Sequence, residues 1–122
     1  SGKHNLVVCL MSYNVYVIEL DKEFGETKKA KKANPFRNPD KPYVYVGYTS
    51  KIPMERFRQH MSGKPGKKGY KLFSRIVYKY GIRLLPDLYE KYNPIPSKAE
   101  AMKMEILLAE SLRKQGYTVW QK

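Results

Sequence analysis

Apolar and polar positions alternate in two segments that share a Val-Tyr-Val centre. The first segment is Val15–Leu20, and Tyr16 is the central residue of its Val-Tyr-Val motif. The second segment is Tyr43–Tyr48, in which Tyr45 has the same place in the motif. Because a period of two puts every second side chain on one face, both segments are predicted to be strands, and we expect them to pair. The short apolar run Leu6–Met11 either extends the first strand or leads into it.

A polar, lysine-rich segment separates the two predicted strands. Asp21–Pro42 reads DKEFGETKKAKKANPFRNPDKP and is interrupted by prolines. It is therefore interpreted as a long excursion between neighbouring strands. Loops of this length are uncommon in compact domains unless they are functional or mobile.

Two segments after the second strand have helical spacing. One helix is predicted from Pro53, a residue suited to the first turn, to Gly63, with Met54, Phe57 and Met61 on its buried face. A second is predicted over Tyr70–Tyr80, ending at Gly81. Its apolar residues at helical spacing are Leu72, Phe73, Ile76, Val77 and Tyr80.

The last third of the chain predicts a short strand and a long helix. Leu84–Tyr89 suits an edge strand, since Pro86 cannot donate a hydrogen bond to a neighbour. The final helix begins at Ser97, where Ser97-Lys98-Ala99-Glu100 forms a capping box, and its apolar pattern runs to Leu112.

Glu105 interrupts the apolar face of this last helix. That face is formed by Ala101, Met104, Leu108, Ala109 and Leu112, and Glu105 falls in its middle. A carboxylate in a buried stripe carries a large desolvation cost unless it is paired or holds a metal. Two interpretations remain open: a structural ion pair with an arginine, or a metal ligand or acid–base group facing the sheet. Glu100 is accounted for by capping.

Arg56 and His60 lie one helical turn apart on the first predicted helix, so their side chains share a face. A lone histidine is more often an ordinary surface or core residue, but a histidine beside an arginine suits phosphate binding or proton handling. Tyr16 and Tyr45 could equally be sheet aromatics with hydrogen-bonded hydroxyls.

The composition is that of one basic globular domain. The chain has 122 residues, with 24 Lys and Arg against 11 Asp and Glu and a net charge of +13. Such an excess suits a polyanion, either nucleic acid or an anionic membrane surface. The single Cys9 excludes an intramolecular disulfide and a cysteine zinc cluster. The apolar runs are too short to span a bilayer and have no signal-peptide layout, so an intracellular protein is expected.

The positive charge is concentrated between Arg56 and Pro86, where there is no acidic residue. A helix face exposed to solvent normally carries charges of both signs. A face that carries only positive charges therefore favours binding to a phosphate backbone. A basic amphipathic helix on a membrane is less favoured, because the apolar residues here are needed for the core. The predicted DNA-binding residues are Lys64, Lys67, Lys68, Lys71, Arg75 and Lys79.

Taken in order, these motifs resemble the GIY-YIG nuclease family. The resemblance rests on Tyr16 in NVYVIEL, Tyr45 in YVYVG, Arg56 and His60 in ERFRQH, and Glu105 in EAMKMEILLAESL, and it covers most of the chain. It implies a small α+β domain, a three-stranded antiparallel sheet flanked by helices. Residues 13–122 would form this domain, with residues 1–12 as a lead-in and residues 21–42 as a lysine-rich insertion.

The resemblance also implies an activity, the hydrolysis of phosphodiester bonds in double-stranded DNA with a divalent metal, Mg²⁺ or Mn²⁺, and no other small-molecule cofactor. Glu105 would hold the metal, and Tyr16, its pKa lowered, would act as general base. Tyr45 would position water or metal-bound groups. Arg56 would stabilise charge on the phosphate, and His60 would assist the nucleophile or the leaving group.

Three features depart from the family pattern. The first motif reads Asn14-Val15-Tyr16 instead of Gly-Ile-Tyr, and the lysine-rich segment makes the interval between Tyr16 and Tyr45 longer than is usual in the family. In addition, no asparagine follows Glu105, so Gln121 is the candidate substitute. A second hypothesis is therefore a non-catalytic nucleic-acid-binding module. The retention of all five candidate catalytic residues favours the nuclease, since binding alone does not need a carboxylate on a core-facing helix surface.

Overall fold

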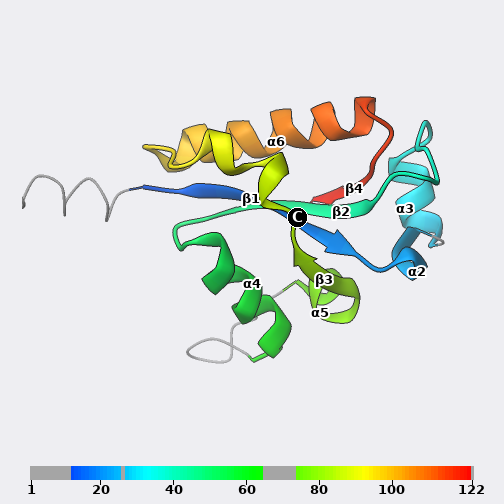
Figure 1. Cartoon of the computed structure of the whole chain (residues 1–122), viewed down its shortest axis with the longest axis horizontal. Helices are drawn as coiled ribbons and strands as arrows, with labels where there is room; N and C mark the ends of the chain where they lie inside the picture. Colours follow the sequence, from blue (N-terminus) through cyan, green and yellow to red (C-terminus); the bar gives the residue numbers. More distant parts are fainter. Residues whose placement is uncertain (1–11, 26, 65–73, 122) are drawn as a thin grey trace, which may run out of the picture.

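A four-stranded sheet forms the centre of the computed structural model, which describes residues 12–25, 27–64 and 74–121 (Figure 1). The strands are β1 (Asn14–Leu20), β2 (Tyr43–Thr49), β3 (Gly81–Leu84) and β4 (Thr118–Gln121), in the order β3-β1-β2-β4. β1 is antiparallel to β2 and β3, whereas β4 is parallel to β2. The expected α+β class is confirmed, but the three-stranded antiparallel sheet is wrong in strand number and direction.

The register of β1 and β2 brings the two Val-Tyr-Val motifs onto the same face. Tyr16 lies opposite Gly47, and Ile18 lies opposite Tyr45, so Tyr16 and Tyr45 are diagonal neighbours. The alternate residues of both strands, valines for the most part, point to the other face. The prediction that these two strands pair is therefore confirmed, and the pairing places Tyr16 and Tyr45 on one face and the valines of both strands on the other.

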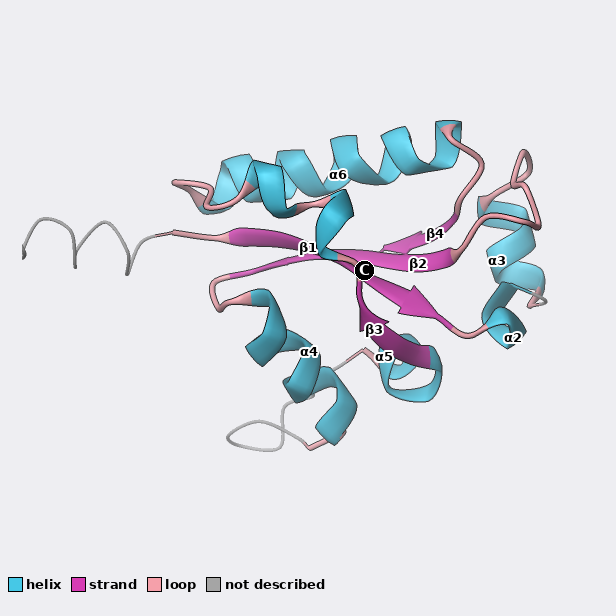
Figure 2. Ribbon diagram, viewed as in Figure 1, coloured by secondary structure: helices cyan, strands magenta, loops and turns pink. Residues whose placement is uncertain are grey.

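Helices cover both faces of the sheet. Helix α6 (Lys98–Lys114) lies along one side, and α4 (Pro53–Ser62) and α5 (Arg75–Tyr80) lie on the other (Figure 2). Ring contacts of His60 on α4 with Tyr16 and Tyr45 identify the α4 side as the tyrosine face. The valine face is consequently the one that packs against α6.

Helix α4 has the predicted ends but a different buried face. Pro53 occupies the first turn, and Gly63 ends the helix in the left-handed conformation, with φ of 62°. His60 is fully buried, whereas Met54 is 45% exposed and Met61 is 37% exposed. The prediction that both methionines are buried is wrong, because the helix turns His60 toward the tyrosine face.

Helix α5 and strand β3 differ from the predicted elements in their limits. Ser74 caps α5, its hydroxyl accepting a hydrogen bond from the Val77 N–H. The rest of the predicted helix, residues 70–73, lies outside the described residues, as does the apolar run 6–11. The strand predicted over residues 84–89 is wrong: β3 ends at Leu84, and Pro86 begins a 3₁₀ turn, Pro86–Leu88. Proline at 86 cannot continue a ladder of backbone N–H donors.

Helix α6 confirms both predictions made for it. The Ser97 hydroxyl caps the helix by accepting a hydrogen bond from the Glu100 N–H, and it donates one to the Glu100 carboxylate. Glu105 is 7% exposed and shares the buried face with Ala101 and Leu108. A carboxylate therefore lies on the core-facing side of the longest helix. Within the described residues, no helix has the length and apolar content needed to cross a lipid bilayer.

The excursion between β1 and β2 contains ordered structure. Two short helices, α2 (Lys22–Gly25) and α3 (Lys28–Ala33), interrupt it, so the interpretation as a loop is wrong for this part. Phe24 is fully buried and contacts the rings of Trp120 and Tyr80, with centroid separations of 5.9 Å and 5.8 Å. One aromatic residue thus anchors α2 to β4 and α5.

Asn34 holds the end of α3 against β4. Its amide nitrogen donates to the carbonyl oxygens of Ala30 and Val119, at 2.8 Å and 3.0 Å. Its amide oxygen accepts from the Val119 N–H at 2.8 Å and from the Arg113 guanidinium at 3.3 Å. A buried side chain thus takes the place of a neighbouring strand on the outer edge of β4.

We expect Asn34→Ala to lower the free energy of unfolding by about 2–4 kcal/mol, because the buried N–H and carbonyl of Val119 would both lose a partner. Chemical denaturation, followed by the fluorescence of Trp120, measures this loss. Asn38→Ala is the matched control, since Asn38 is exposed and its side chain accepts a local hydrogen bond from the Asp40 N–H. Equal stability of the two variants would contradict the role given to Asn34.

Candidate active site

Tyr16, Tyr45 and His60 form one buried aromatic cluster. Their ring centroids lie 5.8–6.2 Å apart, and the Tyr16 hydroxyl is 3.0 Å from Nε2 of His60. Tyr16 is 1% exposed and Tyr45 is 3% exposed. Residues from β1, β2 and α4 that are distant in the sequence are thus brought together, as the motif order suggested.

The backbone of Ser74 determines which nitrogen of His60 carries the proton. The Ser74 N–H donates to Nδ1 of His60 at 2.8 Å, and a backbone N–H can only donate. Nδ1 must therefore be the acceptor, which leaves the proton of neutral His60 on Nε2. His60 consequently donates to the Tyr16 oxygen, and the hydroxyl proton of Tyr16 is directed elsewhere.

Burial raises the pKa of both cluster tyrosines above the ordinary value of 10.0. For Tyr16, loss of hydration is the largest cause, and the Tyr45 phenol adds to it, while Arg56 opposes it through its charge and a hydrogen bond. The expectation of a lowered phenol pKa is therefore wrong for the protein alone. The apolar surroundings favour the neutral phenol more strongly than the nearby guanidinium favours the phenolate.

Arg56 is a half-buried cation directed to the same cluster. It lies one turn before His60 on α4 and hydrogen-bonds to the Gln59 side chain. Its positive charge lowers the pKa of both Tyr16 and Tyr45, in opposition to burial. The arginine is thus placed to stabilise negative charge that develops at the phenol oxygens.

Glu105 approaches this cluster from α6, near the end of β4. Gln121 donates a hydrogen bond to the Glu105 carboxylate at 3.4 Å, and Gln121 pairs with Val46, next to Gly47 in β2. The Glu105 charge raises the pKa of both Tyr16 and Tyr45. The carboxylate is therefore electrostatically coupled to the tyrosines, although its helix covers the opposite face of the sheet.

The donor set around Glu105 suits a hard divalent cation held in part by substrate. Among the residues described, no group of three or more His, Cys, Asp or Glu side chains gathers to form a protein cage. Mg²⁺ commonly binds through one or two carboxylates, with waters and substrate phosphates completing its octahedron. One buried carboxylate with a neutral amide beside it fits that mode of binding.

The predicted DNA-binding residues divide into two groups. Lys64, Arg75 and Lys79 are exposed on or beside α4 and α5, whereas residues 67, 68 and 71 lie outside the described ranges. Arg83, from the same acid-free segment, pairs with Glu19 on β1 at 2.6 Å. The charge of Arg83 is therefore balanced by Glu19. Lys64, Arg75 and Lys79 form the basic surface of α4 and α5.

Two contributors to the cluster could not be inferred from motif spacing. Ser74 acts through its backbone N–H, which no side-chain pattern reports. Gln121 is sixteen residues beyond Glu105, and its contact depends on β4 pairing with β2. The absence of a later asparagine was the one signal that pointed to Gln121.

Residues 35–118 match the GIY-YIG catalytic domain in a comparison with protein families. This match covers more than half of the chain, so the protein belongs to the GIY-YIG family, whose domain is a nuclease domain acting on nucleic acid. The matched part includes Tyr45, Arg56, His60 and Glu105 but begins after Tyr16, which the fold alone places in the cluster. Searches of curated proteins and of solved structures found no match.

Gly47 lies opposite Tyr16, and the absence of a side chain at Gly47 leaves room for the Tyr16 ring. A Cβ atom at this position would lie 2.5 Å from the Tyr16 hydroxyl oxygen and 2.6 Å from its Cζ. We expect Gly47→Ala to destabilise the fold by about 1–3 kcal/mol, the usual cost of overpacking a core. The cost should be smaller in a Tyr16→Leu background, as a thermal-melting double-mutant cycle can show. Equal costs in both backgrounds would contradict the contact.

The raised phenol pKa values predict a loss of stability at high pH. Above pH 10 the unfolded chain releases tyrosine protons that the folded chain keeps, so stabilisation by the buried neutral phenols is fully present below pH 10 and is lost as the pH rises further. We expect the free energy of unfolding to fall by about 1.4 kcal/mol per pH unit for each of the two tyrosines. Urea unfolding at several pH values measures the slope. Tyr16→Phe should reduce it, because that variant lacks one of the two buried phenols.

Proposed function

We propose that this protein is a metal-dependent endonuclease that hydrolyses phosphodiester bonds in double-stranded DNA. The observation that supports this most directly is the convergence of opposite charges on two buried phenols. Arg56 and Glu105 shift the pKa of Tyr16 and Tyr45 in opposite directions. A structural aromatic cluster needs neither charge, whereas metal-assisted phosphate hydrolysis uses a proton acceptor, a cation and a metal-binding carboxylate.

Tyr16 is the proposed general base. Its oxygen already accepts a hydrogen bond from Nε2–H of His60, a donor that remains in place when the oxygen becomes negative. Arg56 favours the same negative charge. His60 therefore acts through Tyr16, as a donor that stabilises and orients the phenolate, and Tyr45 beside them orients the attacking water.

Glu105 is the proposed ligand for Mg²⁺ or Mn²⁺, with Gln121 fixing one of its carboxylate oxygens. When bound, such a cation neutralises charge on the phosphate oxygens and favours ionised neighbouring groups. Arg56 would share in this neutralisation from the opposite helix. The exposed cations at Lys64, Arg75 and Lys79 would hold the phosphate backbone of the duplex without reading its sequence.

Glu105→Gln provides the decisive test of this proposal. Glutamine retains an oxygen that can accept the hydrogen bond from Gln121 but loses the charge that a hard cation needs. We expect a folded protein that binds DNA at least as well and whose Mg²⁺-dependent nicking of plasmid DNA falls by a factor on the order of 10² or more. Glu110→Gln, on the exposed side of the same helix, is the matched control and should keep full activity.

Thermal melting of the same preparations distinguishes a metal ligand from a structural ion-pair partner at Glu105. If Glu105 were a structural ion-pair partner, its replacement would leave a buried cation uncompensated and lower stability by roughly 3–5 kcal/mol. A folded Glu105→Gln protein that nicks DNA at the wild-type rate would exclude Glu105 as the metal ligand. DNA binding without any nicking, in Mg²⁺ or Mn²⁺, would indicate a non-catalytic binding module.

A further inference from the structure

A cavity of about 320 Å³ lies where the end of α3 meets the end of α6. It is formed by the insertion between β1 and β2 together with the last turn of α6 and the residues after it. The lining residues used below are Asn34, Phe36, Arg37, Arg113, Lys114 and Tyr117. None of the residues that line this cavity is acidic, so an anionic occupant would meet no repulsion from the walls.

Phe36 supplies a flat apolar surface at the cavity. It is 90% exposed, the highest value among the large hydrophobic residues of the described chain that are exposed. Covering a solvent-exposed aromatic ring with another flat group is energetically favourable, because it removes apolar surface from water. Nucleobases stack on such rings whatever their identity, because every base has a π face.

Arg113 supplies a cation without a carboxylate partner in the described structure. Its guanidinium donates to three neutral oxygens, on Asn34, Gln121 and the Val119 backbone, at 3.1–3.4 Å. Burial lowers its pKa, and the Glu110 charge only partly opposes this. A phosphate in the cavity would therefore bring a negative charge to a guanidinium whose described hydrogen bonds go to neutral oxygens.

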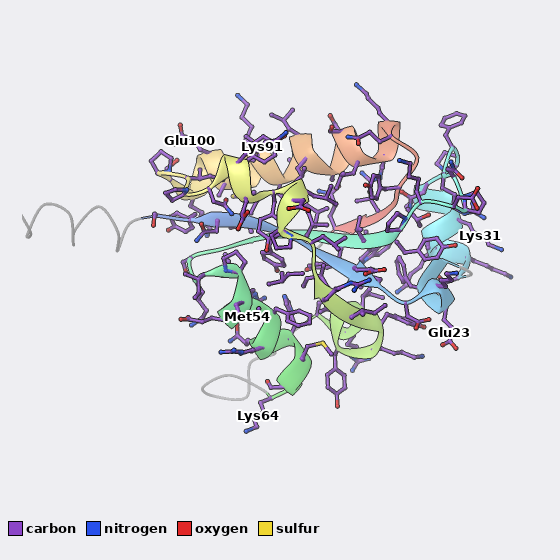
Figure 3. All side chains as sticks on the ribbon, in the orientation of Figure 1. Glu23, Lys31, Met54, Lys64, Lys91 and Glu100 are labelled. Carbon is purple, nitrogen blue, oxygen red and sulfur yellow. The ribbon has the colours of Figure 1, made fainter. Side chains whose placement is uncertain are left out.

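The surroundings extend this positive surface. Lysines 28, 29, 31 and 32 are exposed on α3, and the Lys41 ammonium lies 5.5 Å from the Tyr117 ring centroid. Figure 3 shows Lys31 on α3 and Lys64 below α4 in well-separated parts of the molecule. The cavity and its lysines are therefore distinct from the basic surface of α4 and α5.

We propose that this cavity binds an unpaired nucleotide of the nucleic-acid substrate, with the base against Phe36 and its phosphate facing Arg113. The proposal rests on the proposed function, since it adds a second contact with the same strand. Gln121 accepts a hydrogen bond from Arg113 and donates one to Glu105, so two hydrogen bonds connect the cavity with the candidate metal ligand. The substrate class implied is DNA with a single-stranded part near the cleavage position.

Binding measured in EDTA tests the cavity independently of cleavage. Two fluorescent DNAs of the same sequence are compared, one a blunt duplex and the other a duplex with a short single-stranded extension. We expect the wild-type protein to prefer the extended DNA. Phe36→Ala should reduce affinity for it by roughly 5- to 150-fold, the loss of one stacked base, and leave blunt-duplex affinity unchanged.

Matched variants separate stacking from charge. Lys114→Ala should weaken binding of the extended DNA, whereas Lys98→Ala, at the other end of α6, should not. Ile106→Ala removes a 51%-exposed apolar side chain outside the cavity and should behave as wild type. A 2-aminopurine base in the extension should be quenched by the wild-type protein and by Ile106→Ala, but not by Phe36→Ala.

Four results would overturn the proposal: equal affinity of the wild-type protein for the two DNAs, unchanged binding by Phe36→Ala, equal effects of Lys114→Ala and Lys98→Ala, or a free mononucleotide bound as tightly as the extended DNA. None depends on catalysis. If the preference for extended DNA depends on Phe36 but no preparation nicks DNA, the nuclease proposal fails while the cavity assignment stands. If nicking depends on Glu105 but Phe36→Ala binds normally, the reverse holds.

Discussion

The close approach of the Tyr16 ring to the backbone of Gly47 is the contact on which the candidate site depends. It requires β1 and β2 to pair in one register, because a shift by a single residue would turn Tyr16 to the opposite face. It also requires glycine opposite the ring. With Tyr16 held in this way, His60 on α4 bridges the phenol and the Ser74 backbone. The strand register and the histidine tautomer are thus parts of one arrangement.

Burial and charge act against each other within this cluster. Burial keeps Tyr16 and Tyr45 neutral, which stabilises the fold but opposes the ionisation that a general base requires. Arg56 and the His60 donor favour the phenolate, while Glu105 disfavours it until its charge is matched by a cation. A divalent cation bound at Glu105, as proposed, would offset the Glu105 contribution to the raised phenol pKa values, while the larger contribution of burial would remain.

The lysine-rich insertion has a structural role as well as a proposed binding role. Phe24 and Asn34 attach it to β4, and β4 places Gln121 beside Glu105. The insertion therefore supports the strand that orients the candidate metal ligand, although its residues 21–34 precede the matched part of the family domain. A substitution at Asn34 is expected to disturb both the cavity and the carboxylate, whereas one at Phe36 affects the cavity alone.

The sequence by itself determined the elements with strong local signals. Alternation identified β1 and β2, the proline and glycine limits identified α4, and the capping box identified α6 with Glu105 on its buried face. The motif order also indicated the family. Only the tertiary structure decided the rest. β4 is four residues long and parallel to β2, so it has too little local pattern to be recognised, and the exposure of Met54 and Met61 depends on how α4 is rotated against the sheet. The Ser74 hydrogen bond and the raised phenol pKa values arise from long-range packing, because backbone donors and desolvation leave no mark on residue spacing.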